Sequence, residues 1–414
     1  MKFFLFFLMI IEVALAQENR TDSALARSSI IPGAERIGVY LPMLKGRAVA
    51  IFANSTSLVG HSHLVDTLLK EGIRIQKIFA PEHGFRGTGD AGESIGSQTD
   101  TKTGISIVSL YGKKLKPSPE DLKDVDILIF DIQDVGVRFY TYISSLQEFM
   151  EAAFENSKPL LLLDRPNPNG FYVDGPVLDS AYRSFVGMQT VPVVYGMTIG
   201  EYALMIAGEK WLSKKANERY SYFQHAENSA DTPFHFLIIK CLHYSHDSLY
   251  QLPVRPSPNL PNMQSIYLYP SLCFFEGTAI SLGRGTDKPF QQFGHPSFPQ
   301  QEYQFTPRSQ EGAKNPPLQD QICQGFDLSH MDLPKEIHGR IQLGWLILAY
   351  SLFEDKNSFF LSRGGFFNKL SGNAALMGQI KEGITEAQIR ESWEPALEIF
   401  KKTRRQYLLY PDFK

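Results

Sequence analysis

Continuous apolar segments alternate with helical segments in the first half of the chain. The apolar segments occupy residues 47–56, 73–80, 105–112, 124–136 and 159–168. Helical patterns lie between them at residues 63–72, 118–124 and 141–157. Strands that are apolar throughout and are joined by helices are typical of a parallel sheet covered on both faces. Residues 36–230 are therefore predicted to form a doubly wound α/β domain with a mostly parallel sheet.

The second half of the chain has a different character. It contains loops rich in proline and aromatic residues, such as residues 283–296. Helical patterns follow at residues 336–355 and 385–410, and Pro395 is expected to start a new helix or to kink the second one. We therefore expect residues 231–414 to form a smaller α+β domain that packs on the first.

The chain begins with the pattern of a secretory signal peptide. A lysine precedes an apolar run at residues 3–11, and a small-residue cleavage site ends at Ala16. A membrane anchor is the alternative, but the run is shorter than the ~20 residues that a membrane span needs. We expect residues 1–16 to be removed and residues 17–35 to lead into the fold. This predicts a secreted protein, with the periplasm as its expected location.

The composition narrows the classes of partner. A formal net charge of −3 gives no electrostatic case for nucleic acid or anionic lipid, and no later segment approaches the length of a membrane span. Cys241, Cys273 and Cys323 could form one disulfide or remain three buried apolar side chains. Neither C-x-x-C nor H-E-x-x-H occurs in the sequence, so no metal site and no cofactor is predicted.

Polar residues follow the predicted strands at the points where the strands end. These residues are Asn54, then Glu82 and His83, then Asp131 to Asp134, and finally Asp164 and Arg165. In a doubly wound sheet, ligands bind beyond the carboxyl ends of the strands. The functional site is therefore predicted at this edge of the sheet.

The segment GTGDAG at residues 87–92 fits the G-x-G-x-x-G pattern of a dinucleotide loop. It follows the second strand instead of the first, no helical pattern comes after it, and Asp90 and Glu93 would repel a phosphate. We interpret it as a plain turn or as a glycine-rich loop that closes over a ligand. An NAD(P)-dependent enzyme is the weaker alternative, which the signal peptide also disfavours.

Glu82 and His83 lie next to each other just after a predicted strand. A carboxyl group held there near apolar walls could have a raised pKa and serve as a general acid. His83 is grouped with the candidate substrate-binding residues. The alternative for Glu82 is structural, as the cap of a turn or as the partner of Arg86.

The segment DIQDVGVRFYTY offers two carboxylates, an arginine and two tyrosines. Asp131 and Asp134 would point to opposite faces of a strand, so a joint role requires a turn between them. Arg138 is suited to clamp a carboxylate or a phosphate. Alternatively, an aspartate and Arg138 form a structural pair, and Tyr140 and Tyr142 pack in the core.

Two more segments carry candidate groups. The loop LDRPNPNG presents Asp164, Arg165, Asn167 and Asn169. Amide and guanidinium groups on a proline-stiffened loop suit the recognition of hydroxyl and acetamido groups, although ordinary Asx turns are the alternative. Farther along, Glu276 could be the second carboxylate of a glycosidase pair, or it could anchor Arg284.

Together these motifs resemble those of a known family. FAPEHGFRG, DIQDVGVRFYTY, LDRPNPNG, YGMTIGEYA, YPSLCFFEGT and SLGRGTDKPFQQFG occur in the order found in the exo-β-N-acetylmuramidases of the NamZ type. The resemblance covers essentially the whole chain after the leader. It implies a Rossmann-like domain joined to a smaller C-terminal domain, with the cleft between them. It also implies the removal of N-acetylmuramic acid from the non-reducing end of peptidoglycan fragments.

The resemblance makes Glu82 the leading candidate for the catalytic acid. The residues that it places in the cleft are Asp134, Arg138, Tyr140 and Tyr142. A second carboxylate, Asp134 or Glu276, would activate water or attack the anomeric carbon, unless the substrate's own acetamido group is the nucleophile. Arg138 or Arg284 would bind the lactyl carboxylate of muramic acid.

The sequence thus predicts a secreted glycoside hydrolase of cell-wall turnover and recycling. It would act without a cofactor on a peptidoglycan-derived sugar or muropeptide. The alternative is a non-catalytic secreted protein that binds muropeptides in the same cleft without turning them over. Retaining, inverting and substrate-assisted routes all remain open at this point.

Overall fold

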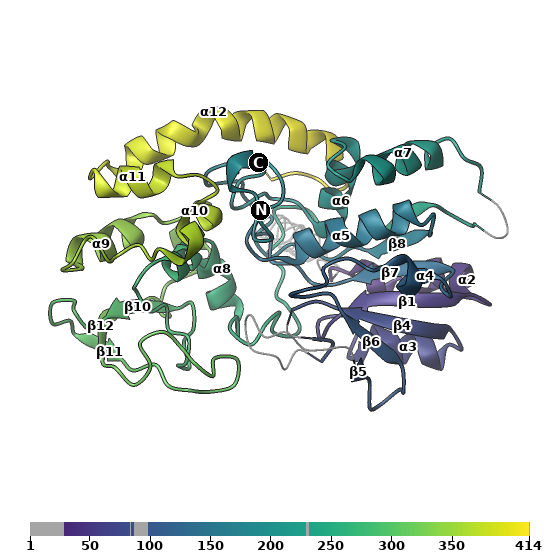
Figure 1. Ribbon diagram of the computed structural model, residues 1–414, viewed down its shortest axis with the longest axis horizontal. Helices are drawn as coiled ribbons and strands as arrows, with labels where there is room; N and C mark the ends of the chain where they lie inside the picture. The colour runs from purple at the N-terminus through teal and green to yellow at the C-terminus, as the bar shows by residue number, and fades with distance from the viewer. Residues whose placement is uncertain (1–28, 83, 87–97, 229–231, 414) are drawn as a thin grey trace, which may run out of the picture.

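A computed structural model describes residues 29–82, 84–86, 98–228 and 232–413 (Figure 1). Its centre is a seven-stranded sheet in the order β5-β6-β4-β1-β7-β8-β9. The parallel strands are β1 (Ala48–Ala53), β4 (Arg74–Ala80), β6 (Ser106–Ser109), β7 (Ile127–Asp131), β8 (Leu160–Leu163) and β9 (Phe236–Ile239), and the antiparallel edge strand is β5 (Gln98–Thr99). Numbered along the chain, the parallel strands lie in the order 3-2-1-4-5-6, which is the Rossmann order. The prediction of a doubly wound α/β fold is confirmed.

Helices cover both faces of this sheet. On one face lie α5 (Tyr142–Glu155), α6 (Ile199–Gly208) and α7 (Lys214–Phe223), and on the other lie α2 (Ile37–Leu44) and α3 (Leu64–Lys70), while α4 (Pro119–Leu122) precedes β7. The side chains of β1 point alternately to the two faces of the sheet and pack in the core on each side. Phe52 packs towards α5, with its ring 5.2 Å from that of Phe149, and Ile51 joins the opposite core with Leu68. A strand buried on both faces has to be apolar throughout, as β1 is.

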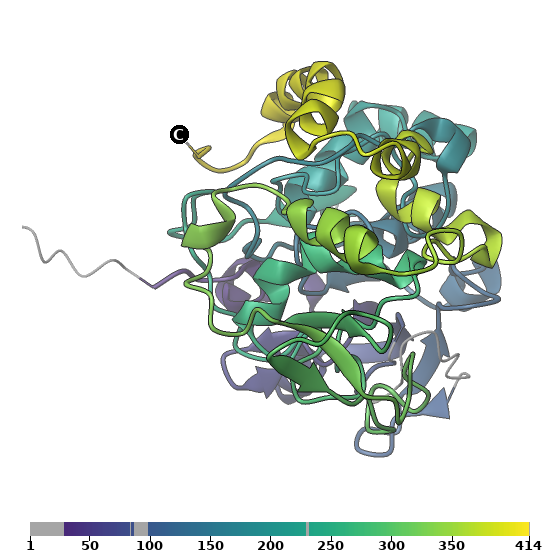
Figure 2. The ribbon, with the colours of Figure 1, turned by 90° about the vertical axis from the view of Figure 1, so that its left-hand side faces the viewer.

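The C-terminal half forms the smaller part of the molecule. Its helices are α8 (Met263–Leu272), α9 (Gly344–Leu352), α10 (Phe366–Ser371), α11 (Ala375–Lys381) and α12 (Glu386–Arg404), with the 3-10 turn η4 (Cys273–Gly277). The antiparallel sheet β10-β12-β11 is built from β10 (Gln292–His295), β12 (Cys323–Asp327) and β11 (Tyr303–Phe305). Figure 2 shows this small sheet in front of the central one. One hydrophobic core runs from the α5 face of the central sheet into this half, so the predicted α+β domain packs on the first.

The end of the chain returns to the first half. Helix α12 arches over the top of the molecule and ends near α6 (Figure 1). Its last residue, Arg404, is buried and donates hydrogen bonds to the carbonyl of Gly196 and to the carboxylate of Asp412. Farther on, the backbone N–H of Leu409 donates to Glu201 at 2.7 Å. These contacts fasten the C-terminal segment to the N-terminal half.

The structure differs from the sequence prediction at two elements. Helix α12 runs through Pro395 without interruption, so the proline does not start a new helix. Its burial against the core through Trp393 and Leu397 supports the helix on both sides of the proline. Strand β9 was not predicted, because it is a short, half-buried edge strand, and it extends the central sheet beyond residue 230.

All three cysteines are buried and unpaired, as in the alternative without a disulfide. Within the described ranges, no helix combines the length and the apolar character that a bilayer crossing requires.

Candidate active site

The candidate site lies at the carboxyl edge of the central sheet, where the strand order reverses. Glu82 follows β4 and Tyr111 follows β6, and both side chains line a cavity of about 360 Å³. Across this cavity, the C-terminal half supplies Tyr269, Glu276 and Arg284. The cavity is therefore built between the two halves, at the place where doubly wound folds bind their ligands.

Glu82 is half-buried, and it accepts a hydrogen bond from the hydroxyl of Tyr111 at 3.0 Å. Burial, together with the negative charge of Glu82, raises the pKa of Tyr111 well above its ordinary value, so this hydroxyl remains a donor at neutral pH. Arg86, the alternative partner considered for Glu82, donates to both carboxylate oxygens of Asp100. Glu82 is thus a carboxyl group fixed at a cavity wall, as a general acid has to be.

Tyr140 and Tyr142 form another wall of the cavity. Their rings meet edge to face with centroids 4.7 Å apart. The hydroxyl of Tyr140 donates to the carbonyl of Pro256 at 2.9 Å, and Asn54 donates to the hydroxyl oxygen of Tyr142. Burial raises the pKa of both phenols, so they offer neutral, polar-edged aromatic surfaces of the kind that suits a sugar.

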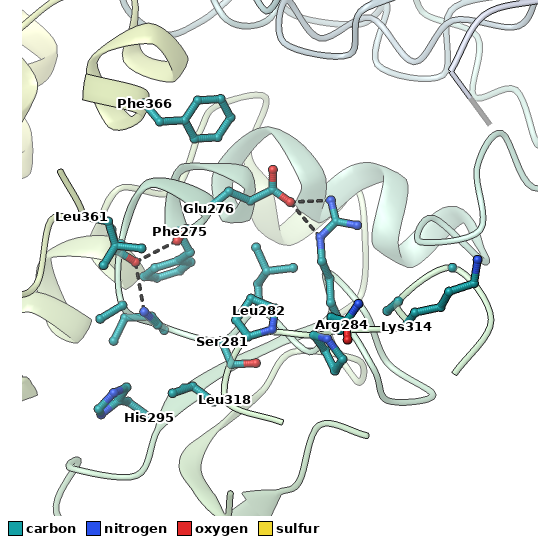
Figure 3. A pocket seen from close by; sticks show the side chains of 18 residues that line it. Phe275, Glu276, Ser281, Leu282, Arg284, His295, Lys314, Leu318, Leu361 and Phe366 are labelled. Atoms are coloured by element: carbon teal, nitrogen blue, oxygen red, sulfur yellow. Dashed lines mark hydrogen bonds and ion pairs between the residues drawn. The ribbon is translucent and has the colours of Figure 1, made fainter. Parts of the chain in front are cut away.

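Glu276 and Arg284 form an ion pair at the opposite wall (Figure 3). The Nε of Arg284 donates to the carboxylate at 2.8 Å, and the guanidinium lies over the ring of Phe290. Both side chains are partly exposed to the cavity, at about 20%. The anchoring role considered for Glu276 is therefore present, and the pair still borders the space that a ligand would occupy.

Asp134 does not line this cavity. Its Oδ2 accepts from the backbone N–H of Gly136 at 2.6 Å and from the hydroxyl of Tyr195, and its Oδ1 has no hydrogen-bond partner among the described residues. Burial raises the pKa of this carboxyl to about 7. Asp134 lies behind the tyrosine wall, where its charge contributes to the raised pKa of Tyr140.

The raised pKa of Asp134 predicts a pH-dependent stability. Between about pH 4 and pH 7 the folded state holds a proton that the unfolded chain has lost, so the free energy of unfolding falls as pH rises. We expect Asp134→Asn to remove a slope of about −1.4 kcal/mol per pH unit between pH 5 and pH 6.5. Urea unfolding of both proteins across this range measures the difference. If the free energy of unfolding changes with pH in the same way in both proteins, the raised pKa of Asp134 is contradicted.

Arg138 is fully buried and lies outside the cavity lining. Its guanidinium donates to the backbone carbonyls of Pro176, Val191 and Leu370, at 2.7–2.9 Å. The predicted clamp on a substrate carboxylate is therefore not available from Arg138 in this structure. Among the arginines that the structure describes, Arg284 is the one that lines the cavity.

The polar side chains of the loop LDRPNPNG form hydrogen bonds and an ion pair inside the protein. Asp164 accepts from Thr198, Gly200 and Tyr410, and Arg165 pairs with Asp131 at 2.6 Å. The amides of Asn167 and Asn169 donate to the backbone carbonyls of Met197 and Val135. All four side chains are buried and none of them lines the cavity, so the substrate contacts predicted for them stay predictions. The Oδ1 of Asn169 is buried without a hydrogen-bond partner among the described residues.

His83 and the glycine-rich residues 87–92 lie outside the described residues.

Comparison with known proteins assigns the chain to a family. Residues 49–264 match the model for the N-terminal region of the exo-β-N-acetylmuramidase NamZ, and residues 267–410 match the model for its C-terminal region. The chain belongs to the NamZ exo-β-N-acetylmuramidase family. The resemblance seen in the motifs is confirmed, and so is the enzyme class, a glycoside hydrolase.

Relatives of this NamZ-family chain match nearly their whole length. The peptidoglycan β-N-acetylmuramidase NamZ of Bacillus subtilis is 38% identical over 392 residues, which cover 90% of this chain and 89% of that protein. A crystal structure of a DUF1343 family protein from Bacteroides fragilis is 45% identical, with a TM-score of 0.81, and covers 93% of this chain and 100% of its own. A second Bacteroides fragilis DUF1343 structure, 27% identical, has a TM-score of 0.73 over 92% and 99% of the two chains.

Several residues that line the cavity were not predicted as site residues from the sequence, among them Tyr111 and Tyr269. Tyr111 carried a usable signal, because it directly follows a predicted strand, as Glu82 does. Tyr269 is the first residue of the motif YPSLCFFEGT, but its place at the cavity depends on how the C-terminal half docks on the sheet.

Proposed function

We propose that this protein releases N-acetylmuramic acid from the non-reducing end of peptidoglycan fragments. The observation that carries the proposal is Glu82, held by Tyr111 at a cavity whose opposite wall contains Arg284. A cavity of about 360 Å³ lies at the small end of the ~300–1,000 Å³ range of ligand sites, as expected for one sugar. The membership of the NamZ family supports the same substrate.

The proposed first step is protonation of the glycosidic oxygen by the carboxylic acid of Glu82, while an oxocarbenium-like transition state develops. Tyr111 fixes the orientation of the carboxyl group through its hydrogen bond. Arg284 donates to Glu276 through Nε and Nη2, and its remaining Nη1 binds the lactyl carboxylate, which distinguishes muramic acid from glucosamine.

For the attack on the anomeric carbon, we propose the substrate's own acetamido oxygen as the nucleophile. Glu276 is the second carboxylate that the cavity contains, but its ion pair with Arg284 weakens it as a nucleophile. Asp134 is separated from the cavity by the tyrosine wall. A substrate-assisted route needs no protein nucleophile, and the leaving group still receives its proton from Glu82.

The pattern of products tests the exo mode. With a tetrasaccharide that begins with N-acetylmuramic acid, the wild-type protein is expected to release that single sugar first and to leave a trisaccharide, because the catalytic cavity has room for one ring. Chromatography of early time points measures this. Disaccharide as the first product would contradict the exo mode. Binding without any product would favour the non-catalytic muropeptide-binding protein.

The proposed location is outside the cytoplasm, in the periplasm, with a role in the turnover and recycling of the cell wall. The support is the signal-peptide pattern of residues 1–16, which predicts a mature protein that starts at Gln17. N-terminal sequencing of protein isolated from its own cells tests this, and an intact first segment would oppose it.

A further inference from the structure

Phe290 has a backbone conformation that a phenylalanine rarely adopts. Its φ is +55°, in the left-handed region, where a bulky side chain costs free energy and glycine is preferred. Of the described residues other than glycine that have a positive φ, Phe290 is the one that lines the catalytic cavity, the cavity of about 360 Å³ that Glu82 also lines. A strained residue at a cavity wall indicates a role for its side chain there.

The strained residue closes the loop that carries Arg284. The loop runs from Leu282 to Phe290, and its ends are joined by the backbone N–H of Phe290, which donates to the carbonyl of Leu282 at 2.8 Å. Gly283 inside the loop also has a positive φ, and a Cβ there would lie only 2.7 Å from the carbonyl oxygen of Lys288. This tight closure brings the ring of Phe290 back against the guanidinium of Arg284.

Arg284 borders open space on two sides. It lines the catalytic cavity and also a larger cavity of about 800 Å³ in the C-terminal half (Figure 3). Two contacts orient its guanidinium, namely the ion pair with Glu276 and the ring of Phe290, whose centroid lies 5.0 Å from Cζ. The carboxylate fixes one edge of the planar group, and the aromatic face fixes its plane. Nη1, which does not bond to Glu276, is left for a ligand.

The ring of Phe290 is itself held by a row of aromatic side chains. It meets the ring of Tyr269 edge to face at 4.9 Å, Tyr269 meets Tyr140 at 5.8 Å, and Tyr140 meets Tyr142 at 4.7 Å. All four line the catalytic cavity, so the row runs from the C-terminal half to the tyrosine wall of the N-terminal half. Edge-to-face contacts are directional, and the row therefore fixes the place of the ring under the guanidinium.

We infer that Phe290 is a positioning residue that determines how well the enzyme distinguishes a substrate with a free carboxylate from one without it. It acts through Arg284, because its ring holds the guanidinium in the orientation that leaves Nη1 for the substrate. The inference rests on the proposed function, in which Arg284 binds the lactyl carboxylate. It also accounts for the strained backbone, since a side chain without a ring would remove one of the two contacts that orient the guanidinium.

The test compares two chromogenic N-acetylmuramic acid glycosides, one with a free lactyl carboxylate and one in which this group is a neutral methyl ester. The ratio of kcat/KM for the acid to that for the ester measures recognition of the carboxylate. Phe290→Leu keeps an apolar side chain without the ring and is expected to lower this ratio about fivefold, through KM for the acid. Phe290→Met, which also lacks a ring, is expected to do the same. A loss of packing alone would slow both substrates equally and leave the ratio unchanged.

A double variant tests whether the ring acts through the arginine. Arg284→Met is expected to lower the ratio at least as much as Phe290→Leu does. Adding Phe290→Leu to Arg284→Met should then change the ratio hardly at all, because no guanidinium is left to orient.

Phe360→Leu is the matched control. Phe360 is a buried phenylalanine of the C-terminal half whose ring centroid lies 5.5 Å from the Nζ of Lys381, outside both cavities. The same loss of a ring beside a cation there should keep the wild-type ratio.

The outcomes separate the inference from the proposed function. If Phe290→Leu and Phe290→Met keep the wild-type ratio while Arg284→Met lowers it, the inference is overturned and the proposed function stands. An equal effect of Phe290→Leu with and without Arg284 would also overturn the inference. If Arg284→Met keeps the ratio, the recognition of the carboxylate by Arg284 fails, and the inference fails with it. If the wild type cleaves neither glycoside, the proposed release of N-acetylmuramic acid is contradicted.

Discussion

Replacing Glu82 by glutamine is expected to lower kcat for the hydrolysis of an unactivated N-acetylmuramic acid glycoside by about 10²–10⁴-fold, the usual contribution of a general acid. Glutamine keeps the shape of the side chain and can still accept the hydrogen bond from Tyr111, but it cannot donate a proton to the glycosidic oxygen. KM should change little, because the cavity walls are unaltered. Initial rates at saturating substrate measure the effect.

The matched control is Glu120→Gln. Glu120 is an exposed carboxylate on α4 that pairs with Lys123 on the surface, outside both cavities. The same chemical change there should leave kcat at the wild-type value. Undiminished turnover by Glu82→Gln, in protein with a native circular dichroism spectrum, would remove Glu82 from the role of the acid.

The second large effect is on stability and concerns the pair of Asp131 with Arg165. Arg165 donates to both carboxylate oxygens of Asp131, at 2.6 and 2.8 Å, and both side chains are at most 2% exposed. Asp131→Asn leaves the guanidinium charge buried without its counter-ion. We expect the free energy of unfolding to fall by about 3–5 kcal/mol, as measured by urea titration at neutral pH.

An exposed pair provides the comparison. Asp320 and Arg308 lie 3.4 Å apart, with side chains 61% and 73% exposed, so Asp320→Asn should change stability hardly at all. In the double variant Asp131→Asn/Arg165→Met, the loss should be smaller than the sum of the two single losses, because neither charge is then left alone. A loss at Asp131 no larger than that at Asp320 would contradict this account.

The sequence predicted the central sheet well, because its strands are buried on both faces. A strand such as β7 packs against helices on each side, so its apolar run is continuous and easy to recognise. The same logic located the functional edge, since parallel strands bring their carboxyl ends together. Glu82 was placed correctly at that edge by its position after β4 alone.

What the sequence could not predict is which polar side chains face the cavity. Arg138, Arg165 and Arg284 are equally plausible as clamps by residue type, but only Arg284 is among the described residues that line the cavity. Arg138 and Arg165 are buried against other partners. Those partners are far away in the chain: Arg138 donates to Leu370, more than 200 residues later. Asp164 likewise receives a hydrogen bond from Tyr410. A local sequence pattern contains no information about contacts between residues so far apart in the chain.

The C-terminal wall of the site was beyond prediction for the same reason. Glu276 and Arg284 were noticed as a possible pair, since they are eight residues apart. Their position opposite Glu82 depends on the shared hydrophobic core that docks the two halves, and that core combines residues from β1 to α12.

The central claim is that Glu82 protonates the leaving group. It is tested most directly by how the loss of kcat in Glu82→Gln depends on the leaving group of the substrate. Dinitrophenolate is a stable anion, so it leaves a glycoside without being protonated. The hydroxyl oxygen of a neighbouring sugar is a poor leaving group and needs a proton from the acid. We expect Glu82→Gln to keep nearly wild-type kcat on the dinitrophenyl glycoside and to lose about 10²–10⁴-fold in kcat on an unactivated disaccharide that begins with N-acetylmuramic acid. An equal loss on both substrates would contradict the assignment of Glu82 as the acid that protonates the leaving group.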